Sequence, residues 1–244
     1  EVITNRGQVH YIPCDIDDNA VRTGMWQMMY FYDQTVKFTP VHADFNDCIE
    51  WAPRTESPRL YTFLGITYGN LTTSERQRLL RTLYRNMNDD DYFLLAVDLV
   101  KDRATMERAY QDSAGFLRMN ILQALANMND QYGAEFEMSA FDHEGRYEDD
   151  RRSIVEYVVS RKDQQVPIEA LGITLDLKEG ERIETEFSEK FVLVDLLKQL
   201  DESGFSPAQT YMDVDMKYAL LLLKRTEMET NPTSSLFPVR RIDG

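Results

Sequence analysis

The sequence predicts an α/β fold in which a parallel sheet is interrupted by a smaller, partly antiparallel α+β subdomain. Up to residue 102, continuously apolar segments alternate with helical segments, which is typical of a parallel sheet covered by helices. Beyond that point the pattern changes to a long helical stretch and then to short segments of alternating polarity. An amphipathic helix and a final strand pair are expected to return the chain to the main sheet.

The strands of the main sheet are expected at residues 9–14, 37–42, 60–66 and 92–99. Acidic residues follow the first of them and suit the start of a helix over residues 19–32. Thr72, Thr73, Ser74 and Glu75 have the pattern of a capping box, which predicts a helix that reaches about residue 85. Strand and helix therefore alternate in this part of the chain.

The sequence patterns divide the whole chain into four expected parts. Residues 1–102 are expected to form the main core, 103–187 an inserted subdomain, 188–226 the return to the core, and 227–244 a linker or surface arm. The subdomain is expected to hold a helical stretch to about residue 132 and short segments at 153–160, 173–177 and 182–187. A helix over 191–200 and an antiparallel pair, 208–214 with 217–224, are expected to follow.

Composition excludes several classes of partner. The chain has 244 residues, and its 42 acidic residues against 27 basic ones give a net charge of -15, which repels nucleic acid and anionic lipid surfaces. Without an apolar run of about 20 residues or a signal-peptide layout, neither a membrane nor export is expected, and the chain is predicted to be cytoplasmic. Cys14, in a strand, and Cys48, in a loop, are expected to be ordinary thiols, and no metal site is predicted.

Two acidic residues follow expected strands. Asp15 lies at the carboxyl end of the first strand, where ligands of open α/β sheets bind and where a carboxylate can accept bonds from ribose hydroxyls. Asp44 and Phe45 follow the next strand, where an acid beside an aromatic ring could hold adenine. The alternatives are a helix N-cap for Asp15 and a turn acid beside a core phenylalanine for Asp44, and both remain open.

The segment 63–71 ends a buried strand in glycines and an asparagine before the capped helix. Glycines let a ligand approach the backbone closely. The Asn70 amide has two donors and an acceptor, so it could hold both the amine and the carboxylate of an amino acid. The alternative is that Asn70 only forms the turn.

Three segments now carry a specific resemblance: Phe63 to Leu71, Asp98 to Asp102 and Ala109 to Gly115. Their order and spacing resemble those of the histidine-specific methyltransferases of ergothioneine biosynthesis. Residues 132–136, 160–164 and 185–191 are also similar to motifs of that family. The similarity covers about residues 11–224 and implies a Rossmann-like methyltransferase sheet with an inserted substrate-binding subdomain.

The resemblance implies S-adenosylmethionine-dependent N-methylation of the α-amine of an amino acid, most simply histidine or a histidine-like substrate. Asp15, Asp44 and Phe45 match residues that hold S-adenosylmethionine. Asn70 and Tyr110 match residues that bind the substrate's amino and carboxylate groups, and Glu186 and Ser188 match the pair that binds its imidazole. Alternate residues of a strand share a face, so the last pair can enter one pocket. Because bulk water can take the proton of the amine, we expect no obligatory general base and no metal.

The chain departs from the family pattern in two places. The glycine-rich cofactor loop and the strand before it are absent, so we expect a further N-terminal segment, or a separate chain, to complete the sheet. Glu156 lies where histidine-specific members carry a methionine. If Glu156 faces the pocket, two carboxylates converge there and call for a cationic guest; a register shift of one residue would turn it to solvent.

Other functions stay open at this point. One is a related methyltransferase that acts on another amino acid or amine. Another is a noncatalytic subunit or degenerate paralogue that lacks the cofactor loop. A plain amino-acid-binding module would leave Asp15 and Asp44 without a role.

Overall fold

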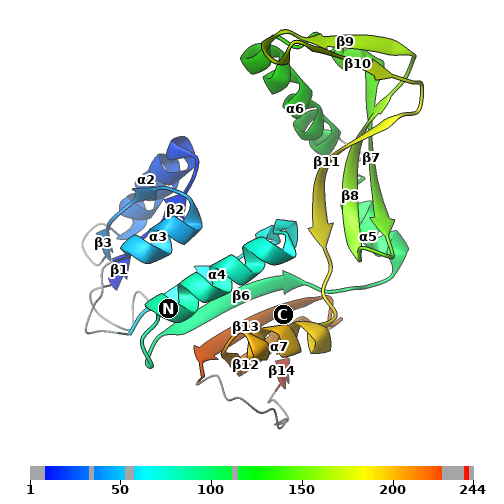
Figure 1. The fold of residues 1–244 in the computed structure, drawn as a ribbon. Helices are drawn as coiled ribbons and strands as arrows, with labels where there is room; N and C mark the ends of the chain where they lie inside the picture. Colours follow the sequence, from blue (N-terminus) through cyan, green and yellow to red (C-terminus); the bar gives the residue numbers. More distant parts are fainter. Residues whose placement is uncertain (1–8, 33–35, 53–57, 112–114, 227–238, 242–244) are drawn as a thin grey trace.

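The computed structural model describes residues 9–32, 36–52, 58–111, 115–226 and 239–241. The element order begins with a small unit of short strands and two helices, continues into a five-stranded sheet, leaves it for a subdomain of helices and antiparallel strands, and then returns (Figure 1). No helix in the described part of the chain is both long enough and apolar enough to cross a membrane.

The five-stranded sheet has the order β14-β12-β13-β6-β5. Its strands are β5 (Leu60–Phe63), β6 (Tyr92–Asp98), β12 (Phe205–Met212), β13 (Tyr218–Arg225) and β14 (Val239–Arg241). β5 pairs with β6 in parallel, whereas β13 pairs with both β6 and β12 antiparallel. The expected terminal strand pair is confirmed. Within the stretch predicted to be a linker or surface arm, β14 adds to β12 in parallel at the edge of the sheet.

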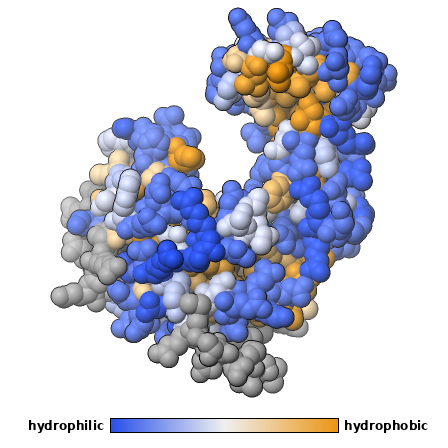
Figure 2. Space-filling model, viewed as in Figure 1, coloured by the Kyte–Doolittle hydropathy of each residue, from blue (hydrophilic) through white to orange (hydrophobic). Residues whose placement is uncertain are grey.

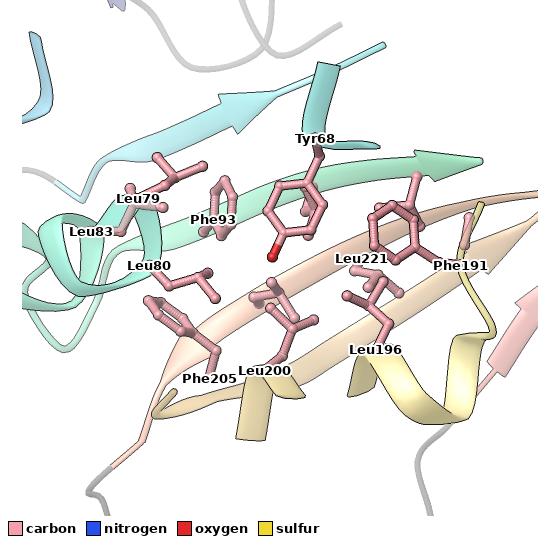
Figure 3. Packing of buried hydrophobic residues seen from close by; sticks show 14 of the residues in the cluster. Tyr68, Leu79, Leu80, Leu83, Phe93, Phe191, Leu196, Leu200, Phe205 and Leu221 are labelled. Atoms are coloured by element: carbon pink, nitrogen blue, oxygen red, sulfur yellow. The ribbon is translucent and has the colours of Figure 1, made fainter. Parts of the chain in front are cut away.

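The main core lies between this sheet and two helices, α4 (Thr73–Asn86) and α7 (Leu193–Glu202) (Figure 3). Residues at helical spacing on one face of each helix are buried, among them Leu79 and Leu83 on α4 and Leu196 and Leu200 on α7. Alternate residues of β13 meet them from the sheet, as strand periodicity requires. Burial of this face holds the scaffold on which the polar site is built.

The N-terminal unit contains two short parallel ladders. β1 (Val9–Tyr11) pairs with β3 (Val36–Phe38), and β2 (Cys14–Asp15) pairs with β4 (Val41–His42). Each predicted strand is thus split in two, because Pro13 and Pro40 have no backbone N–H to give to a ladder. Two helices complete the unit, α2 (Asp18–Tyr32) and α3 (Phe45–Trp51).

The capping box before α4 is confirmed. The Thr72 hydroxyl accepts from the Glu75 backbone N–H, and the Glu75 carboxylate accepts from the Thr72 backbone N–H at 2.7 Å. The predicted third strand ends early, at Phe63, and a 3-10 turn, η1 (Thr67–Asn70), connects it to the helix. This turn places Asn70 at the sheet edge where β6 also ends.

The subdomain leaves the main sheet after β6 and returns beside the same point. Phe191 and Leu99 form a parallel bridge, the Phe191 N–H donates to the Asp98 carbonyl at 2.9 Å, and the Val100 N–H donates to the Phe191 carbonyl at 3.0 Å. The two crossings therefore lie side by side. This arrangement brings the last strand of the subdomain next to η1.

The subdomain is built from two helices and two small sheets. The helices are α5 (Arg103–Ala109) and α6 (Phe116–Tyr132), where a single helical stretch was predicted. One sheet has the order β11-β8-β7, from β7 (Phe141–Glu148), β8 (Ser153–Ser160) and β11 (Arg182–Glu189). The other pairs β9 (Gln164–Ile168) with β10 (Ile173–Leu177); two short 3-10 turns, η2 (Met138–Ala140) and η3 (Glu169–Leu171), precede β7 and β10. β7 and β9 were not predicted, because their residues carry little hydrophobic alternation.

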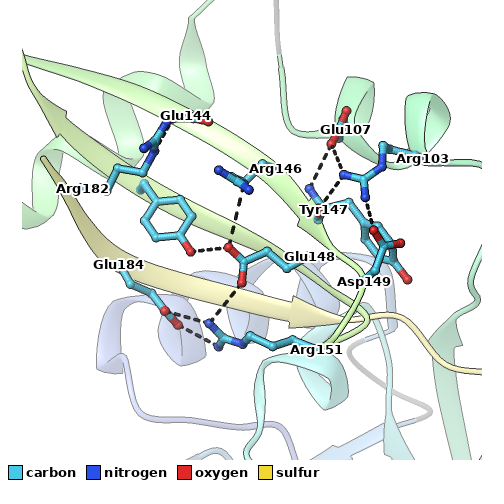
Figure 4. A network of polar contacts seen from close by, with 11 residues as sticks. Arg103, Glu107, Glu144, Arg146, Tyr147, Glu148, Asp149, Arg151, Arg182 and Glu184 are labelled. Carbon is cyan, nitrogen blue, oxygen red and sulfur yellow. Dashed lines mark hydrogen bonds and ion pairs between the residues drawn. The ribbon is translucent and has the colours of Figure 1, made fainter. Parts of the chain in front are cut away.

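The three-stranded sheet has two unlike faces. One face carries charged pairs exposed to solvent, including Arg151 with Glu184 and Arg182 with Glu144 (Figure 4). The other face is apolar at both ends, where Ile154 packs with Met106 of α5 and Val158 packs with residues of α6. The polar residues between these two clusters form the candidate site.

Candidate functional site

The candidate site lies where η1, the end of α5 and β11 meet. Gly69 makes this approach possible: a Cβ at that position would lie 2.5 Å from the Glu189 carbonyl oxygen. The Arg76 guanidinium of α4 pairs with Glu189 at 2.5 Å and lies over the rings of Tyr68 and Phe191. These contacts fix η1 against the strand.

Asn70 and Glu186, two of the predicted substrate-binding residues, are joined by a direct hydrogen bond. The Asn70 amide nitrogen donates to Glu186 Oε1 at 2.6 Å, although 116 positions separate the two residues. Asn70 Oδ1 is buried and has no hydrogen-bond partner among the described residues. A buried amide oxygen without a donor is costly, so this oxygen is suited to an incoming N–H group.

Tyr110 and Ser188, two further predicted substrate-binding residues, are joined through Lys190. Lys190 is only 1% exposed, and its ammonium donates to Tyr110 Oη at 2.7 Å and to Ser188 Oγ at 2.9 Å. The same nitrogen lies 3.3 Å from Asp98 Oδ2 at the end of β6. The lysine charge is thus balanced at the sheet edge, and its bonds hold Tyr110 and Ser188 in one cluster.

Glu156 faces this cluster, which settles the open question of its orientation. It is 2% exposed, lies opposite Glu186 in the strand register, and accepts a hydrogen bond from His143 Nε2. Burial raises the pKa of the Glu156 carboxyl, the His143 hydrogen bond opposes this, and the Glu186 charge raises the pKa further. Two carboxylates therefore share one face of the subdomain sheet.

The predicted cofactor residues lie in the N-terminal unit. Asp15 is exposed at the carboxyl end of β2 and its Oδ1 accepts from the Asp17 N–H at 2.9 Å. Asp44 caps α3, and its Oδ1 accepts from the Asn46 N–H at 2.8 Å. Asp15 thus stabilises a turn rather than capping α2, which begins at Asp18, whereas Asp44 is a helix cap rather than a turn residue. Each of these bonds uses Oδ1. Carboxylate oxygens in this position suit the hydroxyl and amine donors of a nucleoside, so the residues fit such a group.

Phe45 connects this unit to the rest of the site. Its ring packs edge-on against Phe63 at 5.3 Å between centroids, and Phe63 in turn packs against Tyr68 of η1 at 6.4 Å. The aromatic contacts run from the end of β4 to the turn that carries Asn70. Figure 2 shows that the surface is hollowed between this unit and the lobe of α6 and β7 to β11.

The cysteines lie near the cofactor residues. Cys14 is in β2 as predicted, but Cys48 is in α3 rather than in a loop, and both are free thiols. Burial and the neighbouring Cys48 thiol raise the pKa of Cys14 to about 12, so it stays protonated. Within the described ranges, no group of three or more histidine, cysteine, aspartate or glutamate side chains is arranged to hold a metal ion.

The sequence of residues 1–225 matches the model of a family described as histidine-specific methyltransferase, SAM-dependent. The chain belongs to this family. A histidine N-alpha-methyltransferase of Mycolicibacterium smegmatis is 32% identical over 215 residues, and one of Mycobacterium tuberculosis is 33% identical over 192 residues. These matches cover 88% and 78% of this chain. The resemblance stated from the motifs is confirmed.

The relatives differ from the chain in length. The matches cover 66% and 59% of the two histidine N-alpha-methyltransferases, so the chain spans less than two thirds of each. A more distant relative, the N-methyltransferase fsqC of Aspergillus fumigatus, is 22% identical over 221 residues, with 88% of this chain and 58% of the relative covered. A Rossmann-like methyltransferase fold with an inserted subdomain agrees with this membership and with the observed sheet.

Sequence reasoning missed several residues of the candidate site. Lys190 follows Glu186 and Ser188 at strand spacing, so the alternation used for that pair could have found it. Asp98 stands in a motif that was recognised but given no role. His143 gave no signal, because its strand was not predicted and its partner Glu156 lies on another strand.

Proposed function

We propose that this chain works in an S-adenosylmethionine-dependent N-methyltransferase that methylates the α-amine of histidine or a histidine-like amino acid. The observation that carries the proposal is the contact of Asn70 with Glu186, together with the Lys190 bonds to Tyr110 and Ser188. Residues from both parts of the chain meet there in a member of a histidine-specific family. An amino-acid substrate needs such a set of separate polar anchors.

Each anchor has a proposed task. Asn70 and Tyr110 hold the amino and carboxylate groups of the substrate, and Glu186 and Ser188 hold the far end of its side chain. Asp15, Asp44 and Phe45 hold S-adenosylmethionine, which supplies an electrophilic methyl carbon when bound. Fixing the amine against that carbon contributes most of the rate, and water takes the proton, so no obligatory general base is assigned.

The division of the chain follows the same logic. We retain residues 1–102 and 188–226 as the methyltransferase core, 103–187 as the substrate-binding subdomain and 227–244 as the tail. Within the described part, β5 pairs only with β6, and the ladders of β1 and β2 stand apart from the five-stranded sheet. These unpaired strand edges support the proposal that an additional polypeptide segment, of this protein or of a partner, completes the sheet. The cytoplasmic location and the role in ergothioneine biosynthesis stay predictions.

The test uses the full-length protein with S-adenosylmethionine and a panel of amino acids, and mass spectrometry to locate the methyl groups. We expect histidine methylated at the α-amine, with repeated transfer to a trimethylammonium product. Glu186→Gln is expected to lower kcat/KM for histidine by roughly tenfold or more, because a charged hydrogen bond to the substrate is weakened.

A matched control is available on the same strand. Glu184 is also a glutamate of β11, but it pairs with Arg151 on the solvent-exposed face of the sheet. Such exposed pairs contribute about 1 kcal/mol or less to stability, so Glu184→Gln is expected to keep its activity. Methylation only on oxygen or sulfur, or equal activity losses in the two variants, would refute the proposal.

A further inference from the structure

Glu156 has one carboxylate oxygen that the protein leaves unused. Oε2 accepts from His143, whose side chain is 8% exposed, while Oε1 is buried and has no hydrogen-bond partner among the described residues. An unpaired buried carboxylate oxygen costs free energy, and the cost is removed when a donor arrives. This oxygen is therefore suited to bind an N–H group of a ligand.

Gly145 determines where that oxygen lies. It is opposite Glu156 in the register of β7 and β8, and a Cβ there would lie 3.0 Å from Oε1, 3.1 Å from Oε2 and 3.2 Å from Tyr110 Cβ. The missing side chain leaves room for the carboxylate against the strand. The Glu156 carboxylate and the Tyr110 side chain therefore lie against the same glycine, and Lys190, which donates to Tyr110 Oη, also acts on the Glu156 carboxyl through its charge.

Glu186 stands on the other side of Glu156. It is exposed, whereas Glu156 is buried, and the two residues are direct register partners on neighbouring strands. Glu186 is bonded to the neutral amide of Asn70, and Lys190 is engaged by Asp98. In the part of the chain that the structure describes, no lysine or arginine forms an ion pair with either glutamate, although the Lys190 charge and His143 both act on the Glu156 carboxyl. Two neighbouring carboxylates that lack an ion-pair partner of this kind favour a positively charged guest.

We propose that Glu156, oriented by His143, is a specificity-determining residue that selects a substrate with a cationic side chain bearing N–H donors, such as an imidazolium. Glu156 and Glu186 each accept one of these donors. Uncharged aromatic and aliphatic side chains are disfavoured, because they would leave both carboxylates without partners. The proposal rests on the proposed methyltransferase function and names its substrate class. His143 is a positioning residue, since it acts through Glu156.

The test measures charge preference rather than activity alone. Binding of histidine and of thienylalanine, a neutral isostere without a ring N–H, is measured by calorimetry on the full-length protein with S-adenosylhomocysteine present. The unmodified protein is expected to prefer histidine by roughly tenfold to a hundredfold, the range of a hydrogen bond to a charged group. Glu156→Gln is expected to remove most of this preference while thienylalanine binding stays the same.

Two further variants complete the design. His143→Gln is expected to reduce the preference by a smaller factor, because Glu156 keeps its charge but loses its orientation. Glu184→Gln, on the opposite face, is expected to leave the preference unchanged. Equal weakening of both ligands in Glu156→Gln would indicate only a structural role and overturn the proposal.

The outcomes for the two proposals can be told apart. Equal binding of histidine and thienylalanine to the unmodified protein overturns this inference even if no variant folds. Methylation of the α-amine without any charge preference overturns this inference alone. The absence of amino-acid binding and of methyl transfer overturns the proposed function, and this inference with it.

Discussion

Gly69 offers the sharpest test of how the site is assembled. In Gly69→Ala the new Cβ would lie 2.5 Å from the Glu189 carbonyl oxygen and 3.3 Å from its nitrogen, and real Cβ atoms essentially never come closer than 3.0 Å. Both obstacles are backbone atoms, so no side-chain rotation relieves the clash. The turn η1 must move away from β11 by about half an ångström or more.

The magnitude follows from this overpacking. Forcing extra atoms into a packed region typically costs about 1 to 3 kcal/mol. For a chain of this size, each kcal/mol lowers the melting temperature by about 2 to 4 °C. The shift also separates Asn70 from Glu186, which are now 2.6 Å apart, so amino-acid binding is expected to weaken by roughly tenfold.

Thermal unfolding and calorimetric binding of histidine to the full-length protein measure the two effects. Gly24→Ala is the matched control, because a Cβ at that position in α2 meets nothing within 4 Å. Alanine is also the better helix former, so this variant is expected to be as stable or more stable by about 0.5 to 1 kcal/mol. Unchanged stability and affinity in Gly69→Ala would refute the idea that close packing of η1 on β11 builds the site.

Three more predictions concern stability and pH. Thr72→Ala removes the capping box of α4 and is expected to lower the free energy of unfolding, measured in urea, by about 1 kcal/mol. An unchanged urea midpoint would show that the cap does not stabilise the protein. Asp91→Asn leaves Arg59 without its partner and is expected to cost about 3 to 5 kcal/mol, because the Asp91 side chain is fully buried. Burial acts to raise the pKa of Asp91, but bonds from Arg59 and from backbone N–H groups lower it overall, so the stabilisation is complete above the ordinary pKa and is lost as pH falls through the lowered one. A urea midpoint with the same pH dependence in Asp91→Asn would contradict this. Histidine binding is expected to weaken on acidification at a higher pH than an ordinary carboxyl would give, because burial raises the pKa of Glu156; Glu156→Gln should remove this limb of the profile. The titratable and charged groups that surround that carboxyl are His143, Tyr110, Glu186 and Lys190.

The sequence by itself determined the features that depend on neighbouring residues. Apolar runs and helical spacing gave the order of the main strands and helices, and the four residues from Thr72 to Glu75 gave the start of α4, because a cap is made within one turn. The motifs also identified the family. Among the site residues, strand alternation alone placed Glu186 and Ser188 on one face.

Only the tertiary structure decided how distant segments meet. The orientation of Glu156 depends on its register with β7 and β11, and β11 contains a shift between Glu184 and Glu186 that local sequence does not reveal. The bonds of Lys190 join residues up to 80 positions apart, and the bond of Asn70 to Glu186 spans 116. Such contacts follow from long-range strand pairing and from where the chain re-enters the sheet, whereas local propensities act only over a few residues.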